Sequence, residues 1–222
     1  MTILGIDSSD EFLSVGVFRP KEVVISRSTG NEVKKNILHQ FMMETLSLAD
    51  IALSRIDGVA VAIGPGSFTG LRVGLAAAKG LCWAGQLPLA GVSSLLALAQ
   101  CARGDSGSYL AVKDAKKNEY YYGGFSRVKG KISRILPDSI GSADDIGSLV
   151  AQGYGLLGSG VAVYRNKDAE PDSVPEVEYD NQALGGEVAR IGHELIDIRE
   201  TLDIEGSAPV YIRTPRYVIS KA

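Results

Sequence analysis

The stretch AIGPGSFTGLRVG, residues 62–74, constrains the fold more than any other part of the chain. It begins at the end of an apolar run, residues 58–63. It leads into an apolar segment that continues to Trp83, with Arg72 and Lys79 as its charged residues. An apolar run that ends in glycines and proline is typical of a buried strand and a tight turn, and the longer segment after it favours a helix. The stretch therefore predicts a strand–turn–helix unit of an α/β protein.

Strand and helix patterns on both sides of this unit predict a mixed sheet. In the first half, the predicted strands are residues 2–6, 12–18, 22–28, 58–63 and 87–92, and the predicted helices are residues 32–49, 69–84 and 93–102, with Asn31 and Ser93 as caps. In the second half, we predict strands at 109–115, 119–128, 130–137 and 153–160, helices at 142–152 and 183–199, and a loop at 165–181. Antiparallel strands followed by alternating helices and strands predict an α/β fold with mixed sheets flanked by helices.

The stretch ARGDSGS, which begins at Ala102, is the best candidate for a domain boundary. A chain of 222 residues fits one large domain or two small coupled lobes. We therefore expect an N-terminal lobe at residues 1–104 and a C-terminal lobe at residues 105–222. The last helix or the tail can pack back on the first lobe.

A glycine loop between a strand and a helix raises the question of phosphate binding. A P-loop needs a lysine after its last glycine, and a dinucleotide fingerprint needs Gly-x-Gly-x-x-Gly; Gly64, Gly66 and Gly70 match neither pattern. Ser67 or Thr69 can cap the following helix, and the free N–H groups there can bind an anion. We favour the interpretation that the loop builds a tight turn over the interpretation that it binds phosphate.

The helix after the loop is rich in small residues. Gly70, Gly74 and Ala78 recur at every fourth position, a spacing that lets a second helix approach closely. A helix that is apolar all round must be covered on more than one side. The preceding helix adds Met42 and Met43, adaptable side chains that are common at binding surfaces. We interpret the two helices as a partner surface; the alternative is that the chain's own strands cover them.

The residues with catalytic potential do not form a complete site. Asp7 follows the first strand, where an actin-like ATPase or a sugar kinase places a carboxylate for Mg²⁺ and phosphate, but the next residues include no glycine. A turn aspartate that bonds to its own backbone is at least as good an interpretation. The two histidines, His39 and His193, are too far apart in sequence for a metal-binding motif.

Two further features of the second half favour structural roles. Asp114 and Glu119 can form a carboxylate pair but are more often turn caps. The residues Tyr120 to Tyr122 can stack on bases, but sheet packing is the better interpretation. A metal site is not expected.

The overall charge argues against direct nucleic-acid binding. The net charge is −3, and a basic stripe is not evident apart from a short tail that carries Arg213, Arg216 and Lys221. If RNA is involved, most phosphate contacts are expected to come from a partner. Cys82 and Cys101 are predicted to be buried free thiols. Because we recognise no signal peptide and no apolar run of membrane-spanning length, we expect a cytoplasmic protein without a membrane contact.

Several stretches match a known family in order and spacing. They are LGIDSSDEFLSVGV, AIGPGSFTGLRVGLAAAKGL, LAGVSSLLALA, VKDAKKNEYYYGGF, LLGSG and PVYIRT. Together they span nearly the whole chain, and the stretch GPGSFTGLR is the most specific. The chain resembles the bacterial TsaB (YeaZ) family. Two departures are Val33, where the family often has histidine, and Lys116, where it usually has arginine.

The resemblance implies an actin-like (ASKHA) fold of two lobes, each related to ribonuclease H. It implies a role in forming N6-threonylcarbamoyladenosine at position 37 of ANN-decoding tRNAs. In this role the chain is a non-catalytic paralogue that forms a heterodimer with the transferase TsaD, supports assembly with the ATPase TsaE, and meets tRNA only through the complex. A homodimer is expected to be accessible when the chain is alone. Old descriptions of the family as glycoproteases find no support in the residues.

These considerations give two sets of candidate residues. The partner surface is predicted at Val33, Ile37, Phe41, Met42, Thr69, Gly70, Val73, Gly74, Ala77, Ala78 and Leu81. A vestigial or composite nucleotide site is predicted at Asp7, Ser8, Gly64, Gly66, Ser67, Gly158 and Gly160. No cofactor is expected to bind tightly to this chain alone, although ATP with Mg²⁺ can bind at a site shared with TsaD and TsaE. The alternatives are an actin-like ATPase or small-molecule kinase that uses Asp7 and, third, a peptidase-like hydrolase.

Overall fold

The computed structural model of the chain describes residues 1–29, 37–167 and 174–213. The elements follow one another as β1 (Ile3–Asp7), β2 (Ser14–Arg19), β3 (Glu22–Ser28), α1 (Leu38–Leu48), η2 (Leu53–Arg55), β4 (Gly58–Gly64), α2 (Phe68–Gly85), β5 (Leu89–Ser93), α3 (Ser94–Gln100), β6 (Ser106–Asp114), β7 (Glu119–Val128), β8 (Lys131–Ser142), α4 (Ala143–Ala151), β9 (Gly155–Leu157), α5 (Ser159–Lys167), η4 (Asn181–Ala183) and α6 (Leu184–Asp197). The predicted helix cap Asn31 lies outside the described residues.

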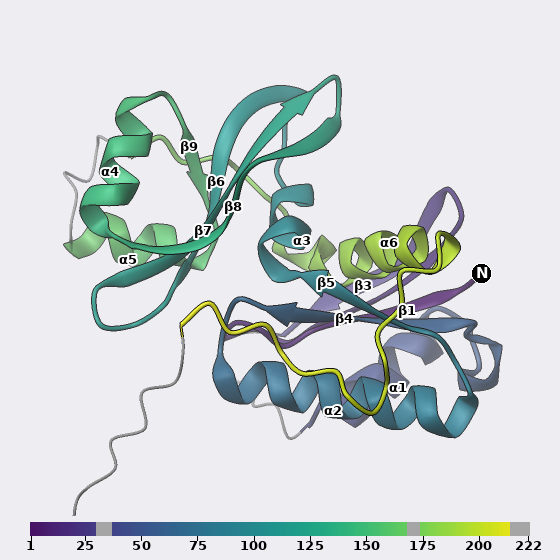
Figure 1. Cartoon of the computed structure of the whole chain (residues 1–222). Coiled ribbons are helices and arrows are strands. Elements are labelled where there is room, and N and C mark those ends of the chain that lie inside the picture. The colour runs from purple at the N-terminus through teal and green to yellow at the C-terminus, as the bar shows by residue number, and fades with distance from the viewer. Residues whose placement is uncertain (30–36, 168–173, 214–222) are drawn as a thin grey trace, which may run out of the picture.

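The strands form two mixed sheets, one in each lobe (Figure 1). The first sheet has the order β3-β2-β1-β4-β5. β2 pairs antiparallel with both β1 and β3, and β4 and β5 run parallel to β1. The second has the order β8-β7-β6-β9, with β9 parallel to β6. The predicted α/β architecture with mixed sheets flanked by helices is confirmed.

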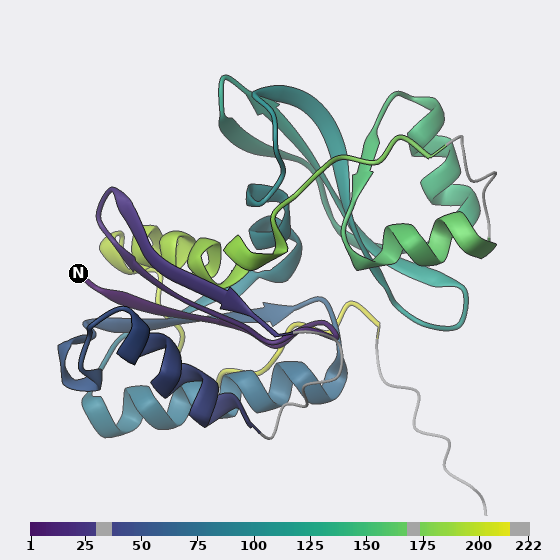
Figure 2. The same ribbon diagram turned by 180° about the vertical axis from the view of Figure 1, so that it is seen from behind.

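Helices cover both faces of the first sheet. Figures 1 and 2 show α1 and α2 on one face and α6 on the other. All five residues of β1 are buried, as expected for a strand that is covered on both sides. Leu4, Ile6 and Val61 point toward α1 and α2, and Ile3 and Ala60 belong to the core on the α6 side.

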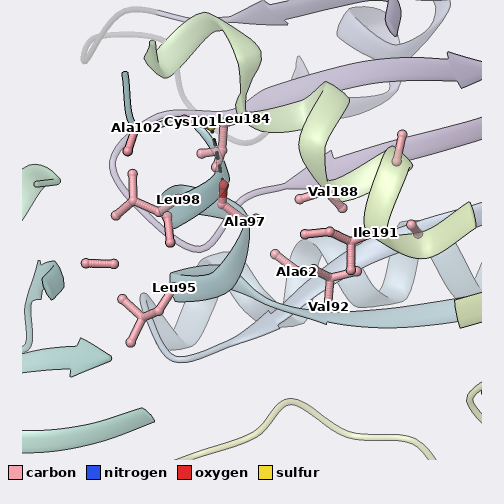
Figure 3. Close-up of a cluster of buried hydrophobic side chains, with 14 of the residues drawn as sticks. Ala62, Val92, Leu95, Ala97, Leu98, Cys101, Ala102, Leu184, Val188 and Ile191 are labelled. Atoms are coloured by element: carbon pink, nitrogen blue, oxygen red, sulfur yellow. Dashed lines mark hydrogen bonds between the residues drawn. The ribbon is translucent and has the colours of Figure 1, made fainter. Parts of the chain in front are cut away.

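The core on the α6 side continues into the second lobe. Figure 3 shows Val188 and Ile191 of α6 facing Ala62 and Val92, and the same cluster includes Leu95 and Leu98 of α3 and Phe125 and Leu157 of the second sheet. A separate core lies between the second sheet and the helices α4 and α5. The two lobes therefore share apolar contacts through α3 and are not independent units.

α6 packs on β1 and β2 at backbone distance. A Cβ atom at Gly5 would lie 2.2 Å from the carbonyl oxygen of Gly185, and one at Gly16 would lie 2.2 Å from the nitrogen of Gly186. Further along α6, a Cβ atom at Gly192 would lie 2.1 Å from Cβ of Ala60. We call these contacts the glycine seam, because any larger residue there would separate the helix from the sheet.

Serine side chains fix several helix starts, as predicted. Ser67 Oγ accepts from the Gly70 N–H of α2 at 3.3 Å, and Ser93 Oγ accepts from the Leu96 N–H of α3 at 3.1 Å. α4 begins with a capping box between Ser142 and Asp145. These hydroxyls satisfy N–H groups that a helix leaves unpaired in its first turn.

The structure differs from the sequence prediction in two elements of the second half. α5 occupies residues 159–167, where we predicted the end of a strand and the start of a loop. β8 continues to Ser142, beyond the predicted end at residue 137. The chain after residue 180 returns to the first lobe, where α6 contacts all five strands. The second sheet and its helices are thus an excursion between α3 and α6.

Gly192 of the glycine seam and Gly80 of α2 both lie inside helices, but replacing each by alanine is expected to change the stability of the protein in opposite directions. At Gly192 an added methyl group would collide with Ala60, whereas at Gly80 of α2 it would meet nothing within 4 Å. We expect Gly192→Ala to lower the free energy of unfolding by about 1–3 kcal/mol through overpacking. Gly80→Ala is expected to raise it by up to about 1 kcal/mol through helix propensity.

Urea unfolding followed by circular dichroism measures both changes. A Gly192→Ala variant as stable as the unaltered chain would contradict the close packing of α6.

Candidate functional site

The turn after β1 is buried between the two lobes. Asp7, Ser8 and Ser9 are each at most 1% exposed. Asp7 Oδ1 accepts from the Ser9 N–H at 2.7 Å and from Ser9 Oγ at 2.5 Å. Asp7 Oδ2 is buried and has no hydrogen-bond partner among the described residues. Asp7 therefore bonds mainly within its own turn.

A buried lysine from the second lobe completes this turn. Lys113 of β6 is 2% exposed, and its Nζ donates to Ser9 Oγ at 2.6 Å. Because Ser9 Oγ in turn donates to Asp7 Oδ1, the hydroxyl links the ammonium group to the carboxylate. A buried charge is tolerated when it has such a counter-charge. The sequence analysis missed Lys113, which lies directly before Asp114 in an otherwise apolar strand.

The glycine loop packs on the same turn. The N–H of Ser67 donates to the carbonyl oxygen of Ser9 at 2.7 Å. A Cβ atom at Gly66 would lie 2.1 Å from that oxygen, and one at Gly64 would lie 2.6 Å from the carbonyl oxygen of Val210. At these two glycines the loop therefore lies directly against the chain's own backbone, as expected of a tight turn.

The other predicted residues of the nucleotide site also contact the chain. Ser8 Oγ donates to the carbonyl oxygen of Gly70 at 2.8 Å. A Cβ atom at Gly158 would lie 2.4 Å from the carbonyl oxygen of Val112, and one at Gly160 would lie 2.9 Å from the carbonyl carbon of Lys113. The structure thus brings the predicted residues together between the two lobes, where they contact other residues of the chain.

The last described residues of the chain, 210–213, pass over this region between the lobes. Tyr211 stacks on Phe68 of α2 with 5.2 Å between ring centroids, and its hydroxyl accepts from Arg72 Nε at 2.9 Å. Arg213 donates to the carbonyl oxygen of Ala115 at 3.0 Å and pairs with Glu119. The segment from Tyr211 to Arg213 thus connects α2 to the second lobe.

The predicted partner surface needs a correction. Phe41, Met42, Gly70, Gly74 and Ala78 are all buried in the chain's own core. A Cβ atom at Gly74 would lie 2.2 Å from Ser8 Oγ, so this stripe of small residues faces the first sheet and cannot contact a partner. Of the other predicted residues, Thr69 is exposed, Ile37, Val73, Ala77 and Leu81 are half-buried, and Val33 lies outside the described residues.

The side of α2 that faces away from the sheet carries different residues. We call it the outer face of α2, and it consists of the exposed residues Phe68, Thr69, Arg72, Ala76, Gly80, Trp83 and Ala84. Trp83 is 66% exposed and Phe68 is 43% exposed. On the neighbouring α1, Met43 and Leu48 are exposed. Phe68 begins α2 and Trp83 lies near its end, so an exposed aromatic side chain stands at each end of the outer face of α2.

Several other candidates take structural roles. Burial raises the pKa of the Cys82 thiol to about 11 and raises that of Cys101, so neither thiol is activated. His39 lies on α1 and His193 on α6, on opposite faces of the first sheet (Figure 1). In the part of the chain that the structure describes, no group of three or more histidine, cysteine or acidic side chains could hold a metal ion.

The acidic and tyrosine candidates of the second lobe are also accounted for. Burial raises the pKa of Asp114, but hydrogen bonds from Lys116 outweigh this and hold it below its usual range. Glu119 pairs instead with Arg213, so the two carboxylates do not form a catalytic pair. Tyr120 is buried edge-to-face against Tyr164, as the sheet-packing interpretation requires.

Among residues 1–29, 37–167 and 174–213, no helix has the length and apolar composition that a membrane crossing requires.

The chain is similar to a family described as TsaD, tRNA N6-adenosine threonylcarbamoyltransferase, whose model matches residues 32–164. It is 30% identical to the tRNA threonylcarbamoyladenosine biosynthesis protein TsaB of Bacillus subtilis, with 96% of this chain and 94% of that protein covered. It is 28% identical to the protein of the same name from Escherichia coli, with 96% of this chain and 95% of that protein covered.

The solved structures agree on the fold. A crystal structure described as a protein with similarity to peptidase YEAZ from Pseudomonas aeruginosa superimposes with a TM-score of 0.79 at 24% identity, covering 96% of this chain and 99% of that one. A structure described as YeaZ from the same organism gives a TM-score of 0.76 at 24% identity, covering 95% and 99%. The expected α/β fold with mixed sheets flanked by helices is confirmed. With near full-length relatives and a matching family model, the chain belongs to the TsaB family of tRNA threonylcarbamoyladenosine biosynthesis proteins.

Proposed function

We propose that this chain is a non-catalytic partner subunit of TsaD in forming N6-threonylcarbamoyladenosine at position 37 of ANN-decoding tRNAs. Family membership and the names of the relatives support a role in this modification. In the proposed role, the chain forms a heterodimer with TsaD and supports assembly with TsaE in the cytoplasm. A homodimer formed by the isolated chain would use the same surface.

The observation that carries the proposal is Gly80 on the outer face of α2. A glycine inside a helix costs about 1 kcal/mol relative to alanine. At Gly5 and Gly192 a close backbone contact explains the glycine, but at Gly80 an added Cβ atom would meet nothing within 4 Å. The chain itself therefore gives no packing reason for Gly80. A helix of a partner protein that approaches closely would supply one.

The surroundings of Gly80 suit an interface. Trp83 and Phe68 are exposed on the same helix, and aromatic residues are enriched among the residues that dominate binding energy. The Arg72 guanidinium lies 3.8 Å from the centroid of the Phe68 ring, which fixes both side chains before any partner binds. The outer face of α2 is thus apolar, partly pre-organised and flanked by small residues.

The non-catalytic role is supported by the turn after β1. A carboxylate that handles Mg²⁺ must have an oxygen available to the ion. Asp7 Oδ1 is engaged by Ser9, and the ammonium group of Lys113 lies one hydrogen bond further on. Asp7 Oδ2 has no partner among the described residues, but a cation placed there would be repelled by this ammonium group, which disfavours a Mg²⁺-nucleotide site. ATP with Mg²⁺ would instead bind at a site shared with TsaD and TsaE.

The alternative of an actin-like ATPase or kinase rests on the unpartnered Asp7 Oδ2. Calorimetry with Mg-ATP on the isolated chain separates the two functions. Binding that Asp7→Ala removes would favour the enzyme.

Transfer of the threonylcarbamoyl group tests the proposed function directly. TsaD and TsaE from the same organism are given tRNA and threonylcarbamoyl-adenylate, with and without this chain, and light scattering follows complex formation. We expect transfer to depend on the chain and a one-to-one complex with TsaD to form. Full transfer without the chain, and no complex, would refute the partner role.

Substitution of Gly80 tests the surface. We expect Gly80→Arg to weaken binding to TsaD at least about tenfold, because a long charged side chain would separate the two surfaces and stay desolvated. The matched control is Ala151→Arg, at an exposed position of α4 on the second lobe. Calorimetric titration with TsaD measures both affinities, and circular dichroism checks the fold. Equal weakening by both variants would argue against the outer face of α2.

A double-mutant cycle tests whether Lys113 is the counter-charge of Asp7. We expect Lys113→Met to lower the free energy of unfolding by about 3 kcal/mol, because it leaves the Asp7 carboxylate buried without a cation. Adding Asp7→Asn should cost less in this background than in the unaltered chain. Urea unfolding measures each variant, with the exposed Lys117→Met as control. Additive effects of the two substitutions would show that the groups are not coupled.

A further inference from the structure

We propose that the tip of the β7–β8 hairpin contacts the phosphate backbone of the tRNA. The tip is residues 126–134, with the sequence SRVKGKISR. The proposal rests on the proposed function, because that function brings tRNA to the complex. It goes further by giving this chain an RNA contact of its own, which the acidic composition argues against.

The tip is positively charged, whereas the chain as a whole has a net negative charge. The chain has 23 basic and 26 acidic residues, whereas the tip has Arg127, Lys129, Lys131 and Arg134 and no acidic residue. Arg134 is neutralised by Asp138. Lys129 and Lys131 are exposed, and neither forms an ion pair with any residue that the structure describes. Two cations are thus presented to solvent without a counter-charge.

The fold holds these two lysines in place. Val128 pairs with Lys131 across a two-residue turn, and Lys129 and Gly130 have φ values of 51° and 77°, as a type I′ turn requires. The N–H of Gly130 donates to the carbonyl oxygen of Asp105 at 3.1 Å. The turn is therefore tied to the start of β6.

Arg127 anchors the base of the tip on the first lobe. Its guanidinium donates to the carbonyl oxygens of Gln100 at 3.0 Å and Gly104 at 3.2 Å. Gln100 is the last residue of α3, where helix carbonyls lack partners and the helix dipole favours a cation. Arg127 is thus used internally, and the lysines beyond it project from a fixed base.

The tip is far from the proposed partner surface. In Figure 1 the end of the second sheet where β6 begins lies at the top, whereas α1 and α2 lie along the bottom, and Figure 2 shows the same separation from behind. A protein can therefore contact the outer face of α2 without contacting the tip. Both surfaces can be occupied at the same time.

Charge complementarity favours RNA as the occupant. Phosphate contacts are made by exposed lysines and need no shaped pocket, and this tip has exposed lysines without one. A simpler role for the lysines is to keep β8, which is an edge strand, from pairing with another sheet. Glutamate would serve that role as well as lysine but would repel RNA, so charge reversal separates the two roles.

The experiment measures tRNA binding to the complex of this chain with TsaD. We compare the unaltered chain with K129E/K131E by fluorescence anisotropy over a series of KCl concentrations. Charge reversal should weaken binding at least about tenfold at low salt and reduce the slope of log K against log salt by about 1.5, because each phosphate contact contributes about 0.7–0.9. The control is Lys21→Glu, at an exposed position of the β2–β3 turn with φ of 74°.

Each outcome decides the proposal. Unchanged affinity and slope for K129E/K131E, or an equal loss for Lys21→Glu, would overturn it. Loss of the protein complex in the absence of tRNA would also overturn it, because the lysines would then contact a protein. If the unaltered chain forms no complex with TsaD, the proposed function fails, and salt-dependent tRNA binding by the isolated chain and its variant then decides the role of the tip.

Discussion

The backbone contact between α6 and the first two strands is the constraint on which the rest of the structure depends. Gly5 and Gly16 meet Gly185 and Gly186 without room for a side chain. This contact brings residues near position 190 onto strands formed by the first 20 residues. The chain between α3 and α6 must therefore leave the first lobe and return to it, and the second sheet is built within that excursion.

The same contact directs the end of the chain. After α6, the N–H of Leu202 donates to the carbonyl oxygen of Leu89, and the N–H of Val210 donates to that of Ile63. Lys79 of α2 donates to the carbonyl oxygens of Glu205 and Ser207. The segment thus runs along α2 before Arg213 reaches the second lobe. Through Phe68 and Arg72, which Tyr211 contacts, this segment borders the proposed interface.

Local patterns predicted the elements well, and long-range contacts explain what they missed. The strand at residues 22–28 and the cap Ser93 depend on neighbouring residues and were predicted from sequence, and Ser67 was one of the two caps proposed for α2. Periodicity also found the small residues of α2. It could not tell that Gly74 faces the sheet and Gly80 faces solvent, because that depends on which side the sheet packs. Lys113 was missed because its partner Ser9 is far away in sequence.

Averages over the chain hid other features. The net charge of the chain argued against RNA binding, although residues 126–134 contain only basic charges. α5 was missed because Gly158 and Gly160 are typical of a turn, and because it lacks a clear apolar stripe. Gly160 is in fact required where α5 begins, since a Cβ atom there would press on the backbone of Lys113. The basic tip and the helix α5 are both local features, and each differs from what the net charge or the usual role of glycine predicts.

The excursion between α3 and α6 has a consequence for synthesis on the ribosome. The five strands of the first sheet emerge before residue 94, but the helix that covers one of their faces ends at Asp197. Since a chain emerges from its N-terminus at about 5–20 residues per second, that face stays open for several seconds while about 100 further residues are made. The second sheet emerges within this interval and can pair its strands first. The lobe that begins the chain is therefore the last to close.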